Sequence, residues 1–263
     1  SMVYPVMQVV MAPAAAWLME AAGVAAILIG QGALSLLAAA IESRISVREE
    51  RRLDGEGFSL RRWLGDLRDA AAYLKKERGL LAIYTYMAVT NGVGNGYSSL
   101  LVAWFSAAPA LYSLFSVAEF AGRSIGGAVR YKREIPRGKR WRFAFLVYNA
   151  YELLDAVLLW LPYPLMLLNR AAAGYLGIGS ATMRLAAVQS YIPDEMRARI
   201  NAFESMLYYI GMGAFSLIVG EVMSPRAAVS VSALFALSVC WLTIFRRRRE
   251  VGAVYDAQPA TAA

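Results

Sequence analysis

Two pairs of ionisable side chains lie inside long apolar stretches of this sequence. Glu119 and Arg123 are four residues apart, and Glu152 and Asp155 are three apart, so each pair shares one face of a helix. Glu119 and Arg123 could form a structural ion pair, or Glu119 could accept a proton that couples transport to a proton gradient. The carboxyl groups of Glu152 and Asp155 could share a proton. All three acidic residues are therefore candidates for proton coupling.

The stretch TNGVGNGYSS places amide side chains among glycines. Asn91 and Asn95 could line a wet cavity and bind a substrate. The alternative is helix packing through small residues, with hydrogen bonds between helices. Arg170 lies in a later apolar stretch and could contact a substrate or extend its charged end to a membrane surface. With Glu119 and Arg123, these residues form the candidate substrate-binding set.

The composition excludes several kinds of site. The chain of 263 residues contains no histidine, so no His-ligated metal or imidazole catalysis is expected. Its single cysteine, Cys240, lies in an apolar run, which excludes disulfide frameworks and cysteine-cluster metal sites. No metal or cofactor is predicted. An intramembrane enzyme is disfavoured too, because the carboxylates lack a histidine and no Ser/Lys signature accompanies them.

Apolar residues dominate the chain in a way that indicates a membrane protein. Hydrophobic residues make up 59% and charged residues 17%, against about 45–50% and about 25% in typical globular chains. About eight segments approach the roughly 20 apolar residues that one membrane crossing requires. We therefore expect an all-α, polytopic membrane protein. The expected spans are 3–19, 22–41, 80–105, 109–129, 143–161, 164–188, 200–222 and 227–245.

Basic residues are concentrated in alternate connections between these segments. Segments 42–78, 130–142, 189–199 and the end after residue 245 are rich in arginine and lysine, while the opposite connections offer only Arg226. By the positive-inside rule both ends of the chain are expected in the cytoplasm, with the spans in the cell membrane. The net charge of +8 thus reflects topology, and no nucleic-acid partner is expected. Lipid is the expected surrounding.

Two polar segments have more specific readings. The stretch FSLRRWLGDLRDAAAYLKKERG predicts an amphipathic helix, lying on the cytoplasmic membrane surface or forming a solvated linker. The stretch QSYIPDEMRARINAF predicts a cytoplasmic turn with acidic residues in the first turn of the following helix. Charged residues in and around this turn could form a cytoplasmic gate: Arg184, Asp194, Glu195, Arg197, Arg199 and Glu204.

Three stretches carry a resemblance to the major facilitator superfamily. VVMAPAAAWLM resembles the fifth-helix motif of its exporters, with Ala12–Pro13 in place of a Gly-Pro pair. FSLRRWLGDLRDAAAYLKKERGLLAIY resembles the linker and seventh-helix entry of the branch related to siderophore and macrolide exporters. Residues 193–199 resemble that branch's connection between helices ten and eleven, with Ala198 replacing a glycine. GRSIGGAVRYKREIPRGKR stands where the family has a Gly-and-basic loop, without its aspartate.

The resemblance implies a major-facilitator-like bundle that lacks helices one to four. Residues 2–41 would be the last two helices of the first half, 42–79 the linker, 80–246 the second half and 247–263 a cytoplasmic tail. The implied function is proton-coupled export of a small amphipathic molecule by alternating access. The alternative is a non-transporting half-transporter or truncated fragment that acts as a scaffold, or as the partner of a separate chain that supplies the missing helices.

Overall fold

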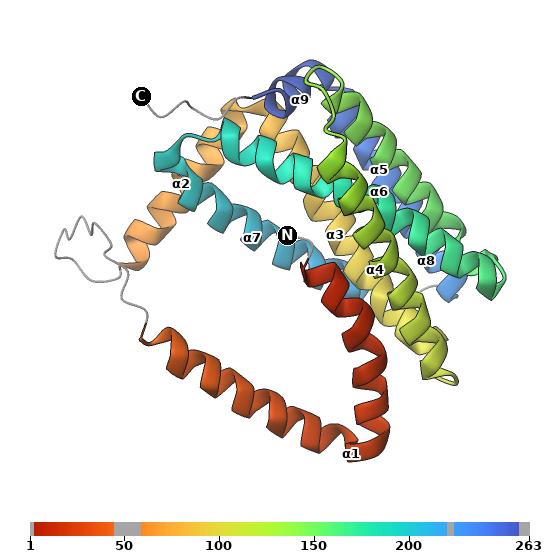
Figure 1. Cartoon of the computed structure of the whole chain (residues 1–263). Helices are drawn as coiled ribbons and strands as arrows, with labels where there is room; N and C mark the ends of the chain where they lie inside the picture. Colours follow the sequence, from red (N-terminus) through yellow and green to blue (C-terminus); the bar gives the residue numbers. More distant parts are fainter. Residues whose placement is uncertain (1–2, 45–58, 220–223, 258–263) are drawn as a thin grey trace.

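The chain is built from helices throughout the part that the structure describes. The computed structural model describes residues 3–44, 59–219 and 224–257, and no strand occurs in these ranges (Figure 1). Some expected features fall outside them. These are residue 2 of the first expected half, 45–58 of the linker, 220–222 of the seventh expected span and 258–263 of the tail.

The first two expected spans form one helix with a sharp kink. Helix α1 (Val3–Glu42) contains one residue with non-helical dihedral angles, Gly23, at φ 76° and ψ 162°. A positive φ is accessible to glycine at little cost, which explains why the chain turns here and not at the expected corner near residue 20. The part before Gly23 lies beside α4, and the part after it leads away from the other helices (Figure 1).

Six long helices correspond to the expected segments between residues 80 and 246. They are α3 (Arg78–Trp104), α4 (Pro109–Lys132), α5 (Arg140–Val157), α6 (Tyr163–Tyr191), α7 (Asp194–Val219) and α8 (Pro225–Cys240). Short turns of other helical type, η1 (Leu158–Trp160) and η2 (Trp241–Phe245), extend α5 and α8. A proline stands in the first turn of α4, α6 and α8. Proline has no N–H group, and at this position an N–H group would have no partner within the helix, so no hydrogen bond is lost.

Three helical stretches in the described residues are both long and apolar enough to cross a membrane. They are Ala21–Glu42, Arg140–Trp160 and Pro225–Phe245. Charged residues lower the apolarity of other long helices: α4 carries Glu119, Arg123 and Arg130, while α6 carries Arg170 and Arg184. The structure is thus compatible with a membrane protein.

Glycines bring α4 and α6 into close contact. A Cβ atom at Gly122 would collide with the carbonyl oxygen of Ala171, and one at Gly174 with the carbonyl oxygen of Glu119. Gly126 meets the backbone of Tyr175 in the same way. Small residues allow backbones to approach closely and gain dispersion contacts, which is how helices associate in lipid. This contact fixes the distance between α4 and α6 on one side of the candidate site.

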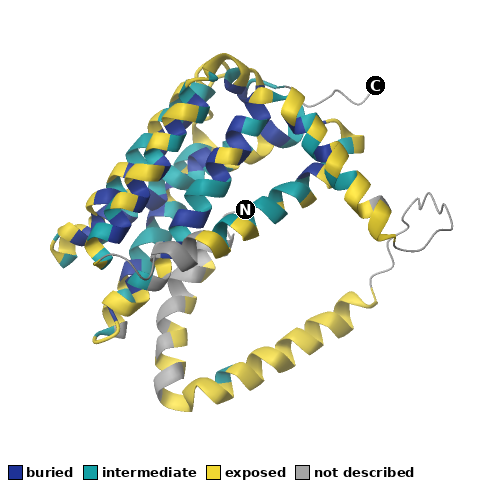
Figure 2. Ribbon diagram, turned by 180° about the vertical axis from the view of Figure 1, so that it is seen from behind, coloured by how far each residue is buried: buried dark blue, intermediate teal, exposed yellow. Residues whose placement is uncertain are grey.

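Two short helices cover one end of the bundle. In α2 (Leu60–Lys76), Ala70 and Leu74 are buried while Trp63 is exposed, so the expected amphipathic helix exists and its second half is docked on the bundle. In α9 (Arg248–Tyr255), Val251 and Tyr255 are fully buried. The expected tail therefore begins with a packed helix. Figure 2 shows the contrast between the bundle, which contains many buried residues, and the exposed second part of α1.

Candidate functional site

A cavity of about 350 Å³ lies between α3, α4, α5 and α6. Its size is within the range of small-molecule sites, about 300–1,000 Å³. It gathers side chains from four helices, from Tyr86 on α3 to Arg184 on α6, which are 98 positions apart in the sequence. Eight of the site residues that the sequence predicted, whether for substrate binding, proton coupling or the gate, line this cavity: Asn91, Asn95, Glu119, Arg123, Glu152, Asp155, Arg170 and Arg184. Asp194, Glu195, Arg197, Arg199 and Glu204 lie elsewhere.

Glu119 and Arg123 form an ion pair on α4. Arg123 Nη2 donates to Glu119 Oε1 at 2.6 Å, and Nε reaches the same oxygen at 3.1 Å. The two side chains are 20% and 35% exposed, respectively, so the pair stands at a wetter part of the cavity. The Glu119 carboxylate therefore has its counter-ion at hydrogen-bond distance on the same helix.

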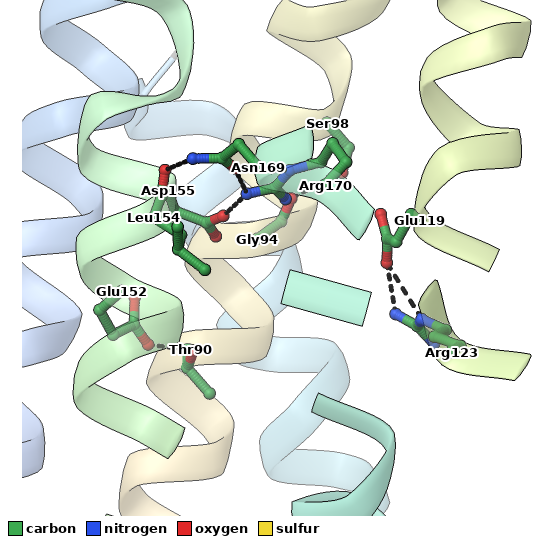
Figure 3. A network of polar contacts seen from close by, with 10 residues as sticks. All are labelled: Thr90, Gly94, Ser98, Glu119, Arg123, Glu152, Leu154, Asp155, Asn169 and Arg170. Carbon is green, nitrogen blue, oxygen red and sulfur yellow. Dashed lines mark hydrogen bonds and ion pairs between the residues drawn. The ribbon is translucent and has the colours of Figure 1, made fainter. Parts of the chain in front are cut away.

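Asp155 and Arg170 form a buried ion pair between α5 and α6. Arg170 Nη2 donates to Asp155 Oδ1, and it also donates to Asn169 Oδ1 at 3.0 Å (Figure 3). Asn169 in turn donates to the carbonyl oxygen of Leu154 at 2.8 Å. Arg170 is 2% exposed and lines the cavity, so of the two alternatives for this side chain the structure does not show the extension to a membrane surface. Its charge is held inside the bundle because a carboxylate and an amide there satisfy its donors.

Glu152 has a different environment from the other two carboxylates. Thr90 Oγ1 donates to Glu152 Oε1 at 2.6 Å, and the Tyr86 hydroxyl donates to the same atom at 2.9 Å. The side chain is buried, and no ion pair with it occurs within the described residues. Glu152 and Asp155 share a helix face but bind separate partners. Neutral hydroxyl groups stabilise a buried charge less than a cation does, so Glu152 is the carboxyl best placed to take up a proton.

The amide side chains of α3 face the same cavity. Asn95 Nδ2 donates to the carbonyl oxygen of Asn91 at 2.9 Å and lies 3.3 Å from the Tyr208 hydroxyl of α7. Ser98 donates to the carbonyl oxygen of Gly94 at 2.6 Å (Figure 3). These side chains of TNGVGNGYSS therefore line the cavity. Asn95 also forms a hydrogen bond between helices, from α3 to α7.

Several lining residues escaped the sequence analysis. Ser180 Oγ is buried and has no hydrogen-bond partner in the described part of the chain, so a ligand or solvent in the cavity could bind it. The two glycines shortly before it in the sequence, Gly177 and Gly179, were the signal that could have identified this position. Tyr86 and Thr90 are one helical turn apart and so point the same way, but nothing local identifies Glu152 on α5 as their shared partner.

The charged residues of the 189–199 turn hold the surface of the bundle together. Arg197 pairs with Asp194 at 2.5 Å and also donates to the carbonyl oxygen of Gln189 at 3.1 Å. Arg199 Nε lies 3.0 Å from Asp66 Oδ1, and its Nη1 lies 3.7 Å from Asp69 Oδ2, which ties α7 to α2. Asp194 and Glu195 occupy the first turn of α7, as expected.

Arg184 and Glu204 interact electrostatically at the same end of the molecule. Arg184 also lines the cavity, so it stands between the cavity and the turn. Nearby, the Tyr191 hydroxyl donates to Glu77 Oε2 at 2.5 Å. Burial, with the Glu77 carboxylate beside it, raises the pKa of Tyr191 to about 12, so the phenol stays protonated as the donor.

Comparisons of the chain with protein families, curated proteins and solved structures find no match. The site must therefore be interpreted from its own chemistry. It combines a central cavity, two acid–arginine pairs and one buried carboxyl bound only by hydroxyl groups. Such a site can hold a small molecule with polar and apolar parts, and its Glu152 carboxyl can take up a proton. No group of His, Cys, Asp or Glu side chains in the described ranges is arranged to hold a metal ion.

Proposed function

We propose that the chain is part of a secondary transporter of the major facilitator type, which exports a small amphipathic molecule in exchange for protons. The observation that carries this proposal is the cavity between α3, α4, α5 and α6, with ionisable side chains at its centre. Transporters bind substrate and coupling ion at an interior site between helices and expose it to each side in turn. Intramembrane ionisable residues mark such pathways.

The lining of the cavity supports an overall neutral, amphipathic substrate. Its acidic residues are Glu119, Glu152 and Asp155, and its basic residues are Arg123, Arg170 and Arg184, so the formal charges balance. Aromatic side chains, among them Tyr112, Phe115 and Tyr151, offer an apolar face. Asn91 and Asn95 add amide groups that can orient a polar end of the ligand.

Within this proposal Glu152 is the principal proton carrier. Glu119 and Asp155 each face an arginine, whereas Glu152 is bound by Tyr86 and Thr90. A proton on Glu152 would be lost or gained at little cost to any ion pair. In this proposal the Asp155–Arg170 pair forms a buried charged side of the site, and the Glu119–Arg123 pair lies at its more exposed edge.

The proposed setting is the cell membrane, with eight spans and both ends of the chain in the cytoplasm. Helical segments at all eight expected positions support it, as do the three helical stretches apolar enough to span. The basic connections after α4 and after α8 support the orientation. In this arrangement α2 and α9 lie at the cytoplasmic end of the bundle.

Transport by inverted membrane vesicles that contain the full chain tests this function. The vesicles are made acidic inside and are given three fluorescent probes: neutral Nile red, cationic ethidium and anionic carboxyfluorescein. We expect at least one probe to accumulate more in these vesicles than in vesicles without the chain. Nigericin, which collapses the pH gradient, should abolish this accumulation. Equal accumulation with and without the chain for all three probes would contradict the proposal.

One observation favours the alternative of a partner-dependent membrane protein. Within Ala21–Glu42, an apolar helix long enough to span, no residue is buried. Large side chains such as Ile29 and Leu36 are about three-quarters exposed, at 74% and 75%. A photo-crosslinking residue at Leu36, on chain extracted from its native membrane, tests this alternative. One recurrent cross-linked polypeptide is expected if a partner covers the helix, whereas cross-links to lipid alone would contradict a partner there.

A further inference from the structure

A second cavity, of about 250 Å³, lies where α4 ends and α5 begins. Residues of α4, of the 133–139 connection, of α5 and of α6 line it, and none of them lines the first cavity. Three of its lining residues are arginines, Arg130, Arg133 and Arg140, and Glu134 is its one acidic lining residue within the described ranges. The lining therefore carries a formal excess of two positive charges, three minus one.

The guanidinium group of Arg130 is held in place by two neighbouring helices. Its central carbon lies 4.3 Å from the centre of the Phe143 ring on α5. Its aliphatic stem crosses α6 at Gly179, where a Cβ atom would come within 2.9 Å of Arg130 Cγ. A cation stacked on an aromatic ring and fitted against a glycine loses little further freedom when it binds a ligand.

Arg140 is anchored on the other side of the cavity. Its Nε donates to the carbonyl oxygen of Ile135 at 3.3 Å, and its Nη1 lies 3.5 Å from the carbonyl oxygen of Tyr255. A guanidinium group carries five N–H donors, so these bonds leave others for a ligand. Asp256, which directly follows α9, accepts from the backbone N–H of Gly138 at 2.7 Å and does not line the cavity.

We propose that this cavity binds a phosphate group, and that its occupant is the headgroup of an anionic phospholipid. Guanidinium groups bind phosphate oxygens through paired, charge-assisted hydrogen bonds. Basic pockets between helices at the cytoplasmic membrane surface suit such headgroups. Tyr131 at 87% exposed and Leu185 at 62% each adjoin a lining residue in the sequence and are large exposed side chains that acyl chains could contact. The lipid identity rests on the proposed membrane setting, while phosphate binding rests on the cavity alone.

Native mass spectrometry of the full chain in detergent tests the site. Phosphatidylglycerol is compared with phosphatidylcholine of the same chain length, and glycerol 3-phosphate serves as the free phosphate. Arg130→Gln/Arg133→Gln is compared with Arg137→Gln/Lys139→Gln, which removes the same amount of charge a few residues further along the chain, at positions that do not line the cavity. A charge-assisted hydrogen bond contributes about 1.5–3 kcal/mol, so the first variant should lower phosphatidylglycerol affinity by about ten-fold or more.

The expected pattern is selective retention of phosphatidylglycerol, lost in the first variant and kept in the second. Gly179→Ala, which preserves every charge but displaces Arg130, should also weaken retention. Equal loss in the two double variants, or equal retention of phosphatidylcholine, would overturn the site. Binding of glycerol 3-phosphate without retention of either lipid would overturn the lipid occupant. None of these readings depends on transport activity, so failure here is distinguishable from failure of the proposed function.

Discussion

The Thr90 hydroxyl of α3 donates to Glu152 Oε1 of α5 at 2.6 Å, and the Tyr86 hydroxyl donates to the same oxygen at 2.9 Å. One turn further along α5, Asp155 faces the guanidinium group of Arg170. Two carboxyl groups on one helix face thus have opposite electrostatic surroundings. Asp155 thus has a cationic partner, whereas Glu152 has two neutral hydroxyl partners.

Asp155→Asn should destabilise the fold strongly, because it leaves the Arg170 charge buried without its counter-ion. Removing one partner of a buried ion pair costs about 3–5 kcal/mol. The double variant Asp155→Asn/Arg170→Gln should recover a large part of that loss. Thermal unfolding in detergent measures both. Equal losses for the single and double variants would show that the pair is not the source of the effect.

Gly174→Ala should separate α4 from α6, since the new Cβ meets the Glu119 carbonyl oxygen. Overpacking of this kind costs about 1–3 kcal/mol. Gly213→Ala is the matched control on α7, where a Cβ meets nothing within 4 Å. There the higher helix propensity of alanine should stabilise slightly, by about 0.5–1 kcal/mol. Unfolding midpoints that move alike in both variants would contradict close α4–α6 packing.

Arg199→Ala should loosen α2 while leaving the bundle folded. The contacts to Asp66 and Asp69 are partly exposed, and such ion pairs contribute at most about 1 kcal/mol. Hydrogen–deuterium exchange of amides 60–76 should therefore become faster by a few-fold. Arg197→Ala, whose ion pair with Asp194 is local, is the control and should leave α2 unchanged. Equal exchange in the two variants would argue that Arg199 does not hold α2.

Glu119→Gln should weaken substrate binding and keep proton coupling. The substitution frees Arg123 at the rim of the cavity but leaves Glu152 with its hydroxyl partners. The expected result is a higher Kd for the transported dye, measured by fluorescence titration, with the pH-gradient dependence of transport retained. If Glu119→Gln lost that dependence, the coupling proton would instead be carried by Glu119, the residue that the sequence alone favoured.

Local patterns predicted much of the fold and part of the site. The proline starts of α4, α6 and α8 and the apolar segments between polar connections marked the helices. The four-residue spacing also anticipated the Glu119–Arg123 pair, because both residues are on one helix. The Gly23 kink was displaced by about three residues, since a corner can form at any residue that tolerates its dihedral angles.

What the sequence could not predict depends on contacts between helices. Arg170 looked free to reach a membrane surface because its partner, Asp155, is on another helix. The tail was expected only to be cytoplasmic, and no helix was predicted there, although the spacing of Val251, Val254 and Tyr255 is that of a buried helix face. Long-range partners of this kind follow from the packing of α5 on α6 and of α9 on α3.

The central claim is that Glu152 carries the coupling proton, and gradient-driven dye transport in vesicles that contain Glu152→Gln tests it most directly. The glutamine keeps the shape and can still accept from Thr90, but it cannot exchange a proton. Glu195→Gln, at an exposed site in the first turn of α7, is the matched control. Glu152→Gln should equilibrate dye without responding to the pH gradient, while the control behaves as the unsubstituted chain. Gradient-driven accumulation of equal extent in Glu152→Gln would contradict the account.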